Sequence, residues 1–277
     1  MKKKTYQQVL PLDEDSKVID QFGWLPTSVF KPTKKPVLEA LVNDKGDPAG
    51  TRRSENAKYL PGLRYSRFHP HLAEAAILYW SLPGDLIIDP FSGRSTRAVI
   101  AGHLGRRYIG YEIVPEAAET TQDNADEHGF ESVSIFNADG RFLSNIADET
   151  ADMVFTCPPY HRLEKYESVP GQLSDIVKYD AFLQSIELSA QNIARVLRPG
   201  KFLCWVCADW RDGKAFRLFH KDSLEIFEQV GLIPWDIVVI HNNSPFAALQ
   251  IGKVAAKRYT SKTHEYLLVF RKPQGEL

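Results

Sequence analysis

Short apolar runs alternate with longer amphipathic segments along most of the chain, and this alternation predicts strands followed by helices. The predicted strands are residues 86–90, 107–113, 133–138, 153–157, 202–208, 233–240 and 266–270. The predicted helices are a segment that starts with proline at residue 70 and residues 95–104, 115–128, 179–197 and 222–230. Because strand alternates with helix, we expect an α/β fold: a doubly wound, mostly parallel sheet of seven strands.

Three regions depart from this alternation. Residues 1–60 are rich in proline and poor in periodic apolar positions, which predicts an irregular N-terminal arm ahead of one domain over residues 61–277. The connections at residues 161–178 and 241–263 are longer than compact domains usually carry, which favours a functional role. Both follow predicted strands, where an α/β sheet places its ligand.

Charge changes this picture locally rather than globally. The net charge is −1, so the whole molecule does not carry the basic excess of many nucleic-acid-binding proteins. One segment, residues 237–264, contains no acidic residue and ends at His264; its basic residues are Lys253, Lys257, Arg258 and Lys262. We expect these side chains to contact phosphates, although a solvated basic loop would give the same pattern.

The chain has no apolar run long enough for a membrane helix, and its start lacks the apolar core of a signal peptide. Its three cysteines suit a reducing compartment, so we expect a cytoplasmic protein. Cys204 and Cys207 fall three positions apart on one predicted strand, so their side chains face opposite sides of the sheet. We therefore expect buried structural thiols and no metal site.

Polar residues close three successive predicted strands. Asp89 ends the first and leads into a turn of small residues, including Gly93, where backbone can approach a ligand. Glu112 stands at the end of the next, where nucleotide-binding sheets hold ribose hydroxyls, and Asp139 follows the third. Each could instead be a turn cap or a solvated acid, but together they predict a nucleotide-like cofactor.

Residues 156–160, Thr-Cys-Pro-Pro-Tyr, follow a fourth apolar strand. The two prolines end that strand and remove amide donors, which leaves the neighbouring carbonyl groups free to accept hydrogen bonds. Tyr160 provides a flat face against which a base can stack. This combination predicts capture of a nucleic-acid base that has been turned out of its helix.

These motifs resemble the amino-methyltransferases that act on adenine or cytosine of DNA, over residues 68–271. The family's marks are an Asp-Pro-Phe-x-Gly-x-Gly-Thr cofactor motif and a later Asp/Asn/Ser-Pro-Pro-Tyr/Phe catalytic motif. The chain looks most like the phage- and plasmid-borne modification methylases, with Leu-Glu-x-Tyr at residues 163–166 and Lys-Thr-His at residues 262–264.

The resemblance implies a Rossmann-like fold, S-adenosylmethionine as methyl donor, DNA as partner and a role in restriction-modification. The implied cofactor residues are Phe68, His69, Pro70, Asp89, Phe91, Ser92, Gly93, Ser95, Thr96, Glu112, Ile113, Asp139 and Gly140. The implied catalytic residues are Cys157, Pro158, Pro159 and Tyr160, with the Pro158 carbonyl accepting from the amine and Tyr160 stacking on the base. No metal or covalent nucleophile is required, and a homodimer is left open.

Two residues depart from the family pattern. Ser95 replaces the second glycine of the cofactor motif, and Cys157 replaces an oxygen-bearing residue, although a thiol is a weak acceptor. The target base, cytosine N4 or adenine N6, therefore stays open. Two alternatives remain: an amino-methyltransferase of tRNA bases, and a non-catalytic DNA-binding protein on a methyltransferase scaffold.

Overall fold

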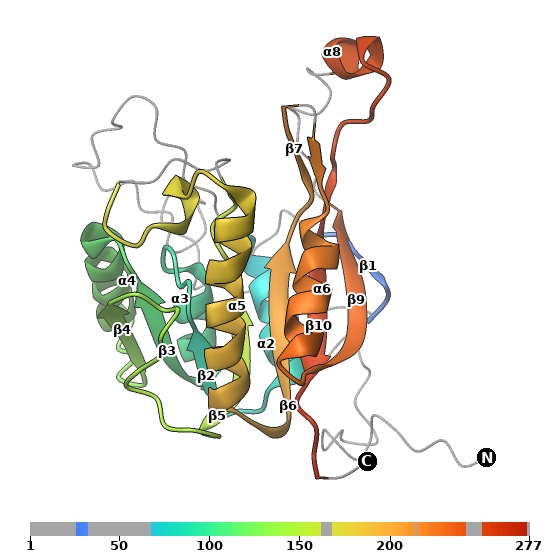
Figure 1. Ribbon diagram of the computed structural model, residues 1–277. Coiled ribbons are helices and arrows are strands. Elements are labelled where there is room, and N and C mark those ends of the chain that lie inside the picture. The colour runs from blue at the N-terminus through green and yellow to red at the C-terminus, as the bar shows by residue number, and fades with distance from the viewer. Residues whose placement is uncertain (1–25, 33–67, 162–167, 214, 242–250, 276–277) are drawn as a thin grey trace.

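The computed structural model describes residues 26–32, 68–161, 168–213, 215–241 and 251–275. An eight-stranded sheet in the order β1-β9-β10-β6-β5-β2-β3-β4 forms its centre (Figure 1). The strands of this sheet are β1 (Val29–Phe30), β2 (Leu86–Asp89), β3 (Arg107–Glu112), β4 (Val133–Asn137), β5 (Ala151–Thr156), β6 (Leu197–Cys207), β9 (Ile233–His241) and β10 (His264–Arg271). Neighbouring strands are parallel except at β10, which runs antiparallel to both β6 and β9.

Helices cover both faces of the sheet, as a doubly wound fold requires (Figure 1). They are α2 (Pro70–Trp80), α3 (Thr96–His103), α4 (Pro115–Glu127), α5 (Tyr179–Val196), α6 (Phe219–Gln229) and the short α8 (Ile251–Ala256). Apolar side chains of α2, α3 and α4 join one buried cluster, and those of α5 and α6 join a second cluster across the sheet. The predicted α/β architecture is therefore confirmed.

Successive residues of β6 alternate between these two clusters. Cys204 belongs to the cluster under α2 and Cys207 to the cluster under α5, and neither side chain is exposed. Burial raises the pKa of both thiols well above the ordinary value. The prediction of buried structural thiols on opposite faces is confirmed.

The predicted sheet lacked one strand. β1 lies inside the predicted N-terminal arm and pairs in parallel with Val239 and Ile240 of β9, so the sheet has eight strands rather than seven. Two residues are too few to show a period, which is why the apolar pattern did not reveal this strand. The division into an arm at residues 1–60 and a domain at residues 61–277 stays a prediction, and most of that arm lies outside the described residues.

Two further elements interrupt the predicted connections. A hairpin of β7 (Trp210–Asp212) and β8 (Ala215–Arg217) follows β6, and α8 lies within the connection expected at residues 241–263. Both project beyond the edge of the sheet in Figure 1. None of the helices in the described ranges is long and apolar enough to cross a membrane.

Candidate active site

A cavity of about 520 Å³ lies at the carboxyl ends of β2, β3, β4 and β5, a size typical of small-molecule sites. It brings together most of the predicted cofactor and catalytic residues: Phe68, His69, Phe91, Ser92, Gly93, Glu112, Ile113, Asp139, Gly140, Cys157, Pro158, Pro159 and Tyr160. The remaining cofactor candidates, Pro70, Asp89, Ser95 and Thr96, do not line it. Its walls come from segments far apart in the sequence, which the topology of the parallel sheet brings to one edge.

Asp89 has a different place from the one expected. Its side chain is fully buried below the cavity, and its Oδ1 accepts hydrogen bonds from the Thr156 hydroxyl at 2.6 Å and the Phe91 N–H at 3.1 Å. Its Oδ2 accepts from the Arg97 guanidinium at 2.6 Å and the Tyr108 hydroxyl at 2.7 Å. We therefore assign Asp89 to building the turn between β2 and α3 rather than to lining the cavity.

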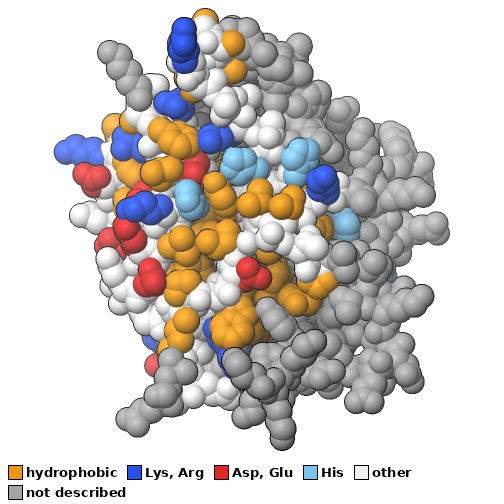
Figure 2. Space-filling model, turned by 90° about the vertical axis from the view of Figure 1, so that its right-hand side faces the viewer, with side chains coloured by type: hydrophobic (Ala, Val, Ile, Leu, Met, Phe, Trp, Pro, Cys, Tyr) orange, Lys and Arg blue, Asp and Glu red, His pale blue; other side chains and the backbone are white. Residues whose placement is uncertain are grey.

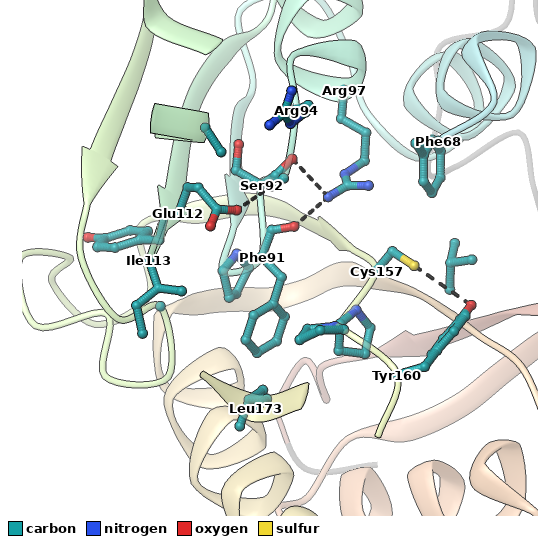
Figure 3. A pocket seen from close by; sticks show the side chains of 18 of the residues that line it. Phe68, Phe91, Ser92, Arg94, Arg97, Glu112, Ile113, Cys157, Tyr160 and Leu173 are labelled. Atoms are coloured by element: carbon teal, nitrogen blue, oxygen red, sulfur yellow. Dashed lines mark hydrogen bonds between the residues drawn. The ribbon is translucent and has the colours of Figure 1, made fainter. Parts of the chain in front are cut away.

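Arg97 connects this buried carboxylate to the wall of the cavity. Burial alone would lower its pKa, but Asp89 and Tyr108 raise it above the ordinary value, so the guanidinium stays charged. Its Nη2 donates to the carbonyl oxygens of Phe91 at 2.6 Å and of Ser92 at 3.2 Å (Figure 3). The Arg97–Asp89 pair thereby fixes the backbone of the turn.

Glu112 lies on the opposite side of that turn. Its carboxylate accepts hydrogen bonds from the backbone N–H groups of Gly93 at 3.0 Å and of Val114 at 2.8 Å. Burial raises the pKa of this carboxyl group, while the two N–H donors favour its ionised form. The side chain thus presents a fixed acceptor to the cavity.

Two glycines allow the backbone to close tightly around this part of the cavity. Gly93 has a φ of +58°, a conformation that side chains rarely adopt. At Gly140 an added Cβ would lie 1.8 Å from the Pro90 carbonyl oxygen, so no other residue fits without moving the backbone. A bonded carboxylate beside a backbone cradle suits the ribose hydroxyls of a nucleoside, so the residues fit the expected cofactor.

Asp139 lines the same cavity but is paired within the protein. The Nε and Nη2 groups of Arg141 donate to its carboxylate, with an Nη2–Oδ2 distance of 2.6 Å, and the Arg141 backbone N–H also donates to Oδ1. The expected contact with an adenine amino group stays a proposal, since the carboxylate oxygens that would accept it also bind Arg141.

Ser95 stands where the family has a second glycine, and its backbone has a φ of +41°. The strain expected for a non-glycine residue there is offset by two contacts. Its N–H donates to the Thr121 hydroxyl at 3.0 Å, and Asn124 donates to its Oγ at 2.7 Å. This turn therefore keeps a glycine-like conformation without glycine, with both contacts coming from α4.

The Cys157–Tyr160 segment leaves β5, which is buried along its whole length between β2 and β6. The Tyr160 hydroxyl lies 3.8 Å from the Cys157 sulfur, and Figure 3 shows this contact at the cavity wall. The same hydroxyl donates to the Glu265 carboxylate at 3.3 Å. The Tyr160 ring packs nearly parallel to the Trp210 ring, with centroids 6.2 Å apart.

The predicted phosphate contacts lie away from the cavity wall. Lys257, Arg258 and Lys262 are exposed and His264 is half-buried, with its Nε2 3.1 Å from the Tyr266 hydroxyl; the Lys253 side chain is outside the described residues. The Lys262 ammonium lies 4.5 Å from the Phe216 ring centre on β8. The Arg211 guanidinium of β7 lies 4.4 Å from the Tyr259 ring centre.

Sequence reasoning missed several residues of the site. Arg97 is followed by an apolar helical run, and Arg141 follows Asp139 in an irregular segment, so neither carried a periodic signal. Glu265 also lines the cavity, and it directly follows the Lys-Thr-His segment in the sequence. Its position next to that family segment was a signal that could have identified it. Within the described ranges, no three His, Cys, Asp or Glu side chains are grouped so as to hold a metal ion.

Comparisons with known proteins find methyltransferases of nucleic acids. Type II methyltransferase M.MjaI of Methanocaldococcus jannaschii is 28% identical over 50% of this chain and 55% of its own length. A tRNA (guanine(10)-N2)-dimethyltransferase of Methanothermobacter thermautotrophicus is 35% identical over 28% of this chain and 22% of its own. The chain thus spans about half, or less, of the length of these curated relatives.

A solved structure shares the fold. The geranyl diphosphate C-methyltransferase of Streptomyces coelicolor, determined with S-adenosyl-L-homocysteine, superposes with a TM-score of 0.52 at 13% identity, over 73% of this chain and 79% of that one. The family model described as "DNA methylase" matches residues 27–123 and 151–276, which include every wall of the cavity except that formed by Asp139 and Gly140. The chain belongs to this DNA methylase family of amino-methyltransferases.

Proposed function

We propose that this protein transfers a methyl group from S-adenosylmethionine to the exocyclic amino group of a DNA base, cytosine N4 or adenine N6. The observation that carries the proposal is one cavity joining a nucleoside-binding wall, with Glu112 and Gly93, to the Pro-Pro-Tyr turn. Family membership and the type II relatives support it. A sulfonium methyl group, when bound, supplies the electrophile.

The chain's own residues prepare the amine. An exocyclic amine is a poor nucleophile while its lone pair is delocalised into the ring. Hydrogen-bond acceptors on its N–H groups favour a pyramidal nitrogen and release that lone pair. The Pro158 carbonyl is one such acceptor, and the Tyr160 ring provides a wall against which the base is held. Orientation of the two reactants supplies much of the remaining rate acceleration.

A second surface supports DNA as the substrate. We define the hairpin–helix patch as Arg211, Phe216, Lys257, Tyr259 and Lys262, in which Arg211 and Lys262 lie over aromatic rings and Lys257 is exposed. Phosphates and unstacked bases are bound by this combination of side chains. Figure 2 shows Lys and Arg side chains gathered toward the top of that face, the level at which α8 stands in Figure 1. A cytoplasmic location and a homodimer remain predictions.

The experiment is transfer of labelled methyl from S-adenosylmethionine to duplex DNA of varied sequence. We expect incorporation into DNA, and we expect Tyr160→Ala and Pro158→Ala each to lower it at least 100-fold while leaving the Kd for S-adenosylhomocysteine within about threefold. If both variants lost cofactor binding as well, the Pro-Pro-Tyr turn would belong to the cofactor site instead.

tRNA is the second candidate substrate, because a tRNA guanine-N2 dimethyltransferase is among the relatives. The amine chemistry would be the same, and only the nucleic acid would differ. Unmodified tRNA offered beside duplex DNA in the same assay separates the two candidates. Label in tRNA alone would replace the DNA proposal, and no binding of S-adenosylhomocysteine would favour a non-catalytic scaffold.

A further inference from the structure

The position before Pro-Pro in this chain lacks the oxygen acceptor that the family motif provides. Cys157 lines the cavity, but a thiol accepts hydrogen bonds weakly and cannot serve as well as a carboxylate or hydroxyl. The Pro158 carbonyl can accept a hydrogen bond from one amine N–H, but it is too weakly basic to remove the proton. Methyl transfer leaves a proton on nitrogen that must be removed, so another group has to take it.

A carboxylate stands next to this position. Glu265, at the start of β10, lines the same cavity, and its Oε1 lies 3.3 Å from the Tyr160 hydroxyl. That hydroxyl is also the group 3.8 Å from the Cys157 sulfur, so Glu265 and Cys157 meet at one atom of the catalytic motif. β10 is the antiparallel strand inserted between β6 and β9, and its first residues reach the cavity from the side of the Pro-Pro-Tyr turn.

The other acidic residues of the cavity lie at the ends of other strands. Of the described residues that line it, Glu112 accepts two backbone N–H groups at the end of β3, and Asp139 is held by Arg141 at the end of β4. Asp89 does not line the cavity and is paired with Arg97. Glu265 is the carboxylate of this set that adjoins the motif.

We infer that Glu265 is the general base of the methyl transfer, supplying the acceptor that Cys157 lacks; the inference rests on the proposed function. The amine lone pair forms the N–C bond to the methyl carbon, and the C–S bond breaks with its electron pair remaining on sulfur. The nitrogen then carries one positive charge and releases one proton to the Glu265 carboxylate, which passes it to water. In the product, one methyl group has replaced one proton on the exocyclic nitrogen of the nucleobase.

The test compares Glu265→Gln with the wild type in single-turnover methyl transfer. Glutamine keeps an oxygen that can accept the Tyr160 hydrogen bond but cannot take a proton at neutral pH. We expect the rate to fall at least 100-fold. The Kd values for S-adenosylhomocysteine, measured by calorimetry, and for DNA, measured by fluorescence anisotropy, should change less than about threefold.

Four further variants separate loss of the general base from other effects. Glu265→Asp, which keeps a carboxylate, should retain at least about ten times the rate of Glu265→Gln, and Cys157→Asp added to Glu265→Gln should restore at least about tenfold. Glu187→Gln, on an exposed position of α5, is the matched control and should leave the rate unchanged. Glu265→Ala gives the same comparison should the Gln variant not fold.

A rate for Glu265→Gln within threefold of wild type, or equal rates for the Asp and Gln variants, would overturn the role of Glu265 and leave the proposed function intact. Absence of transfer by the wild-type protein to any DNA would instead overturn the proposed function itself. The two failures are therefore distinguishable.

Discussion

The Asp89 carboxylate is buried at the turn between β2 and α3, where the Arg97 guanidinium and the hydroxyls of Thr156 and Tyr108 donate hydrogen bonds to it. The sequence places an acid after a strand and before a turn, which is how the residue was identified. Whether its carboxylate faces the cavity or the core depends on partners such as Thr156, which is 67 positions away. Long-range partners leave no local signal, so the pattern indicated a turn after this strand but not the buried position of its first residue.

Loss of the Asp89 charge should destabilise the fold. In Asp89→Asn the Arg97 guanidinium, 5% exposed, would remain buried without its ion-pair partner. Breaking one side of a buried pair typically costs about 3–5 kcal/mol. Urea unfolding should show this loss in the free energy of unfolding. Asp148→Asn, which removes a 72% exposed partner of Arg195, is the control and should cost less than about 1 kcal/mol. A loss for Asp89→Asn no larger than that of the control would mean that the pair does not stabilise the turn.

At the level of elements, the strands and the five longer helices were predictable because each carries enough residues to show its period. β5 is the clearest example, since it is a central parallel strand buried on both faces and contains the apolar run Met153-Val154-Phe155. β1, β7 and β8 were missed because two or three residues show no period, and α8 was missed because its six residues make fewer than two helical turns. The position of the cavity was predictable because the carboxyl ends of parallel strands meet at one edge of the sheet. Glu265 was not predicted, because it lies near the start of β10, an antiparallel strand to which this rule does not apply.

Helix α2 carries a buried acid whose ionisation should affect stability. Glu74 is 4% exposed, and burial raises its pKa from 4.5 to about 7. Because the folded-state pKa is the higher one, folding favours the neutral form, and its stabilising contribution, complete below pH 4.5, is lost as pH rises to about 7. The free energy of unfolding should fall by roughly 1 kcal/mol per pH unit across this window.

Glu74→Gln should remove that part of the pH dependence. The measurement is the free energy of unfolding in urea, for wild type and variant, at pH 5, 6 and 7. The difference between the two proteins is used at each pH, because groups that titrate equally in both contribute nothing to it. The variant should gain stability relative to wild type as pH rises. A difference that does not change with pH would show that Glu74 is solvated in the folded protein.

For the whole molecule, a net charge of −1 concealed a local basic surface. The sequence located the basic segment, but not the cation–ring contacts that the β7–β8 hairpin makes with it. Lys262 of the segment lies over the Phe216 ring of β8, and the Tyr259 ring of the segment lies under Arg211 of β7. A search for a nucleic-acid-binding surface therefore has to consider the local distribution of charge as well as the net charge.

Removing two cations of the hairpin–helix patch should weaken DNA binding in a salt-dependent way. For Arg211→Ala with Lys262→Ala, we expect the slope of log K against log salt to become shallower by about 2, because each phosphate contact contributes about 0.9. Fluorescence anisotropy at several salt concentrations gives the slope. Lys221→Ala, at an exposed position of α6 where the side chain pairs with Glu225, is the control. An unchanged slope would place DNA on another surface.

If the protein methylates an amino group of a DNA base, the methylated nucleoside identifies that reaction. DNA treated with the protein and labelled S-adenosylmethionine is digested to nucleosides, which are identified by mass spectrometry. The structure and the family predict N4-methylcytosine or N6-methyladenine. 5-Methylcytosine, or no methylated nucleoside in any DNA offered, would contradict the account.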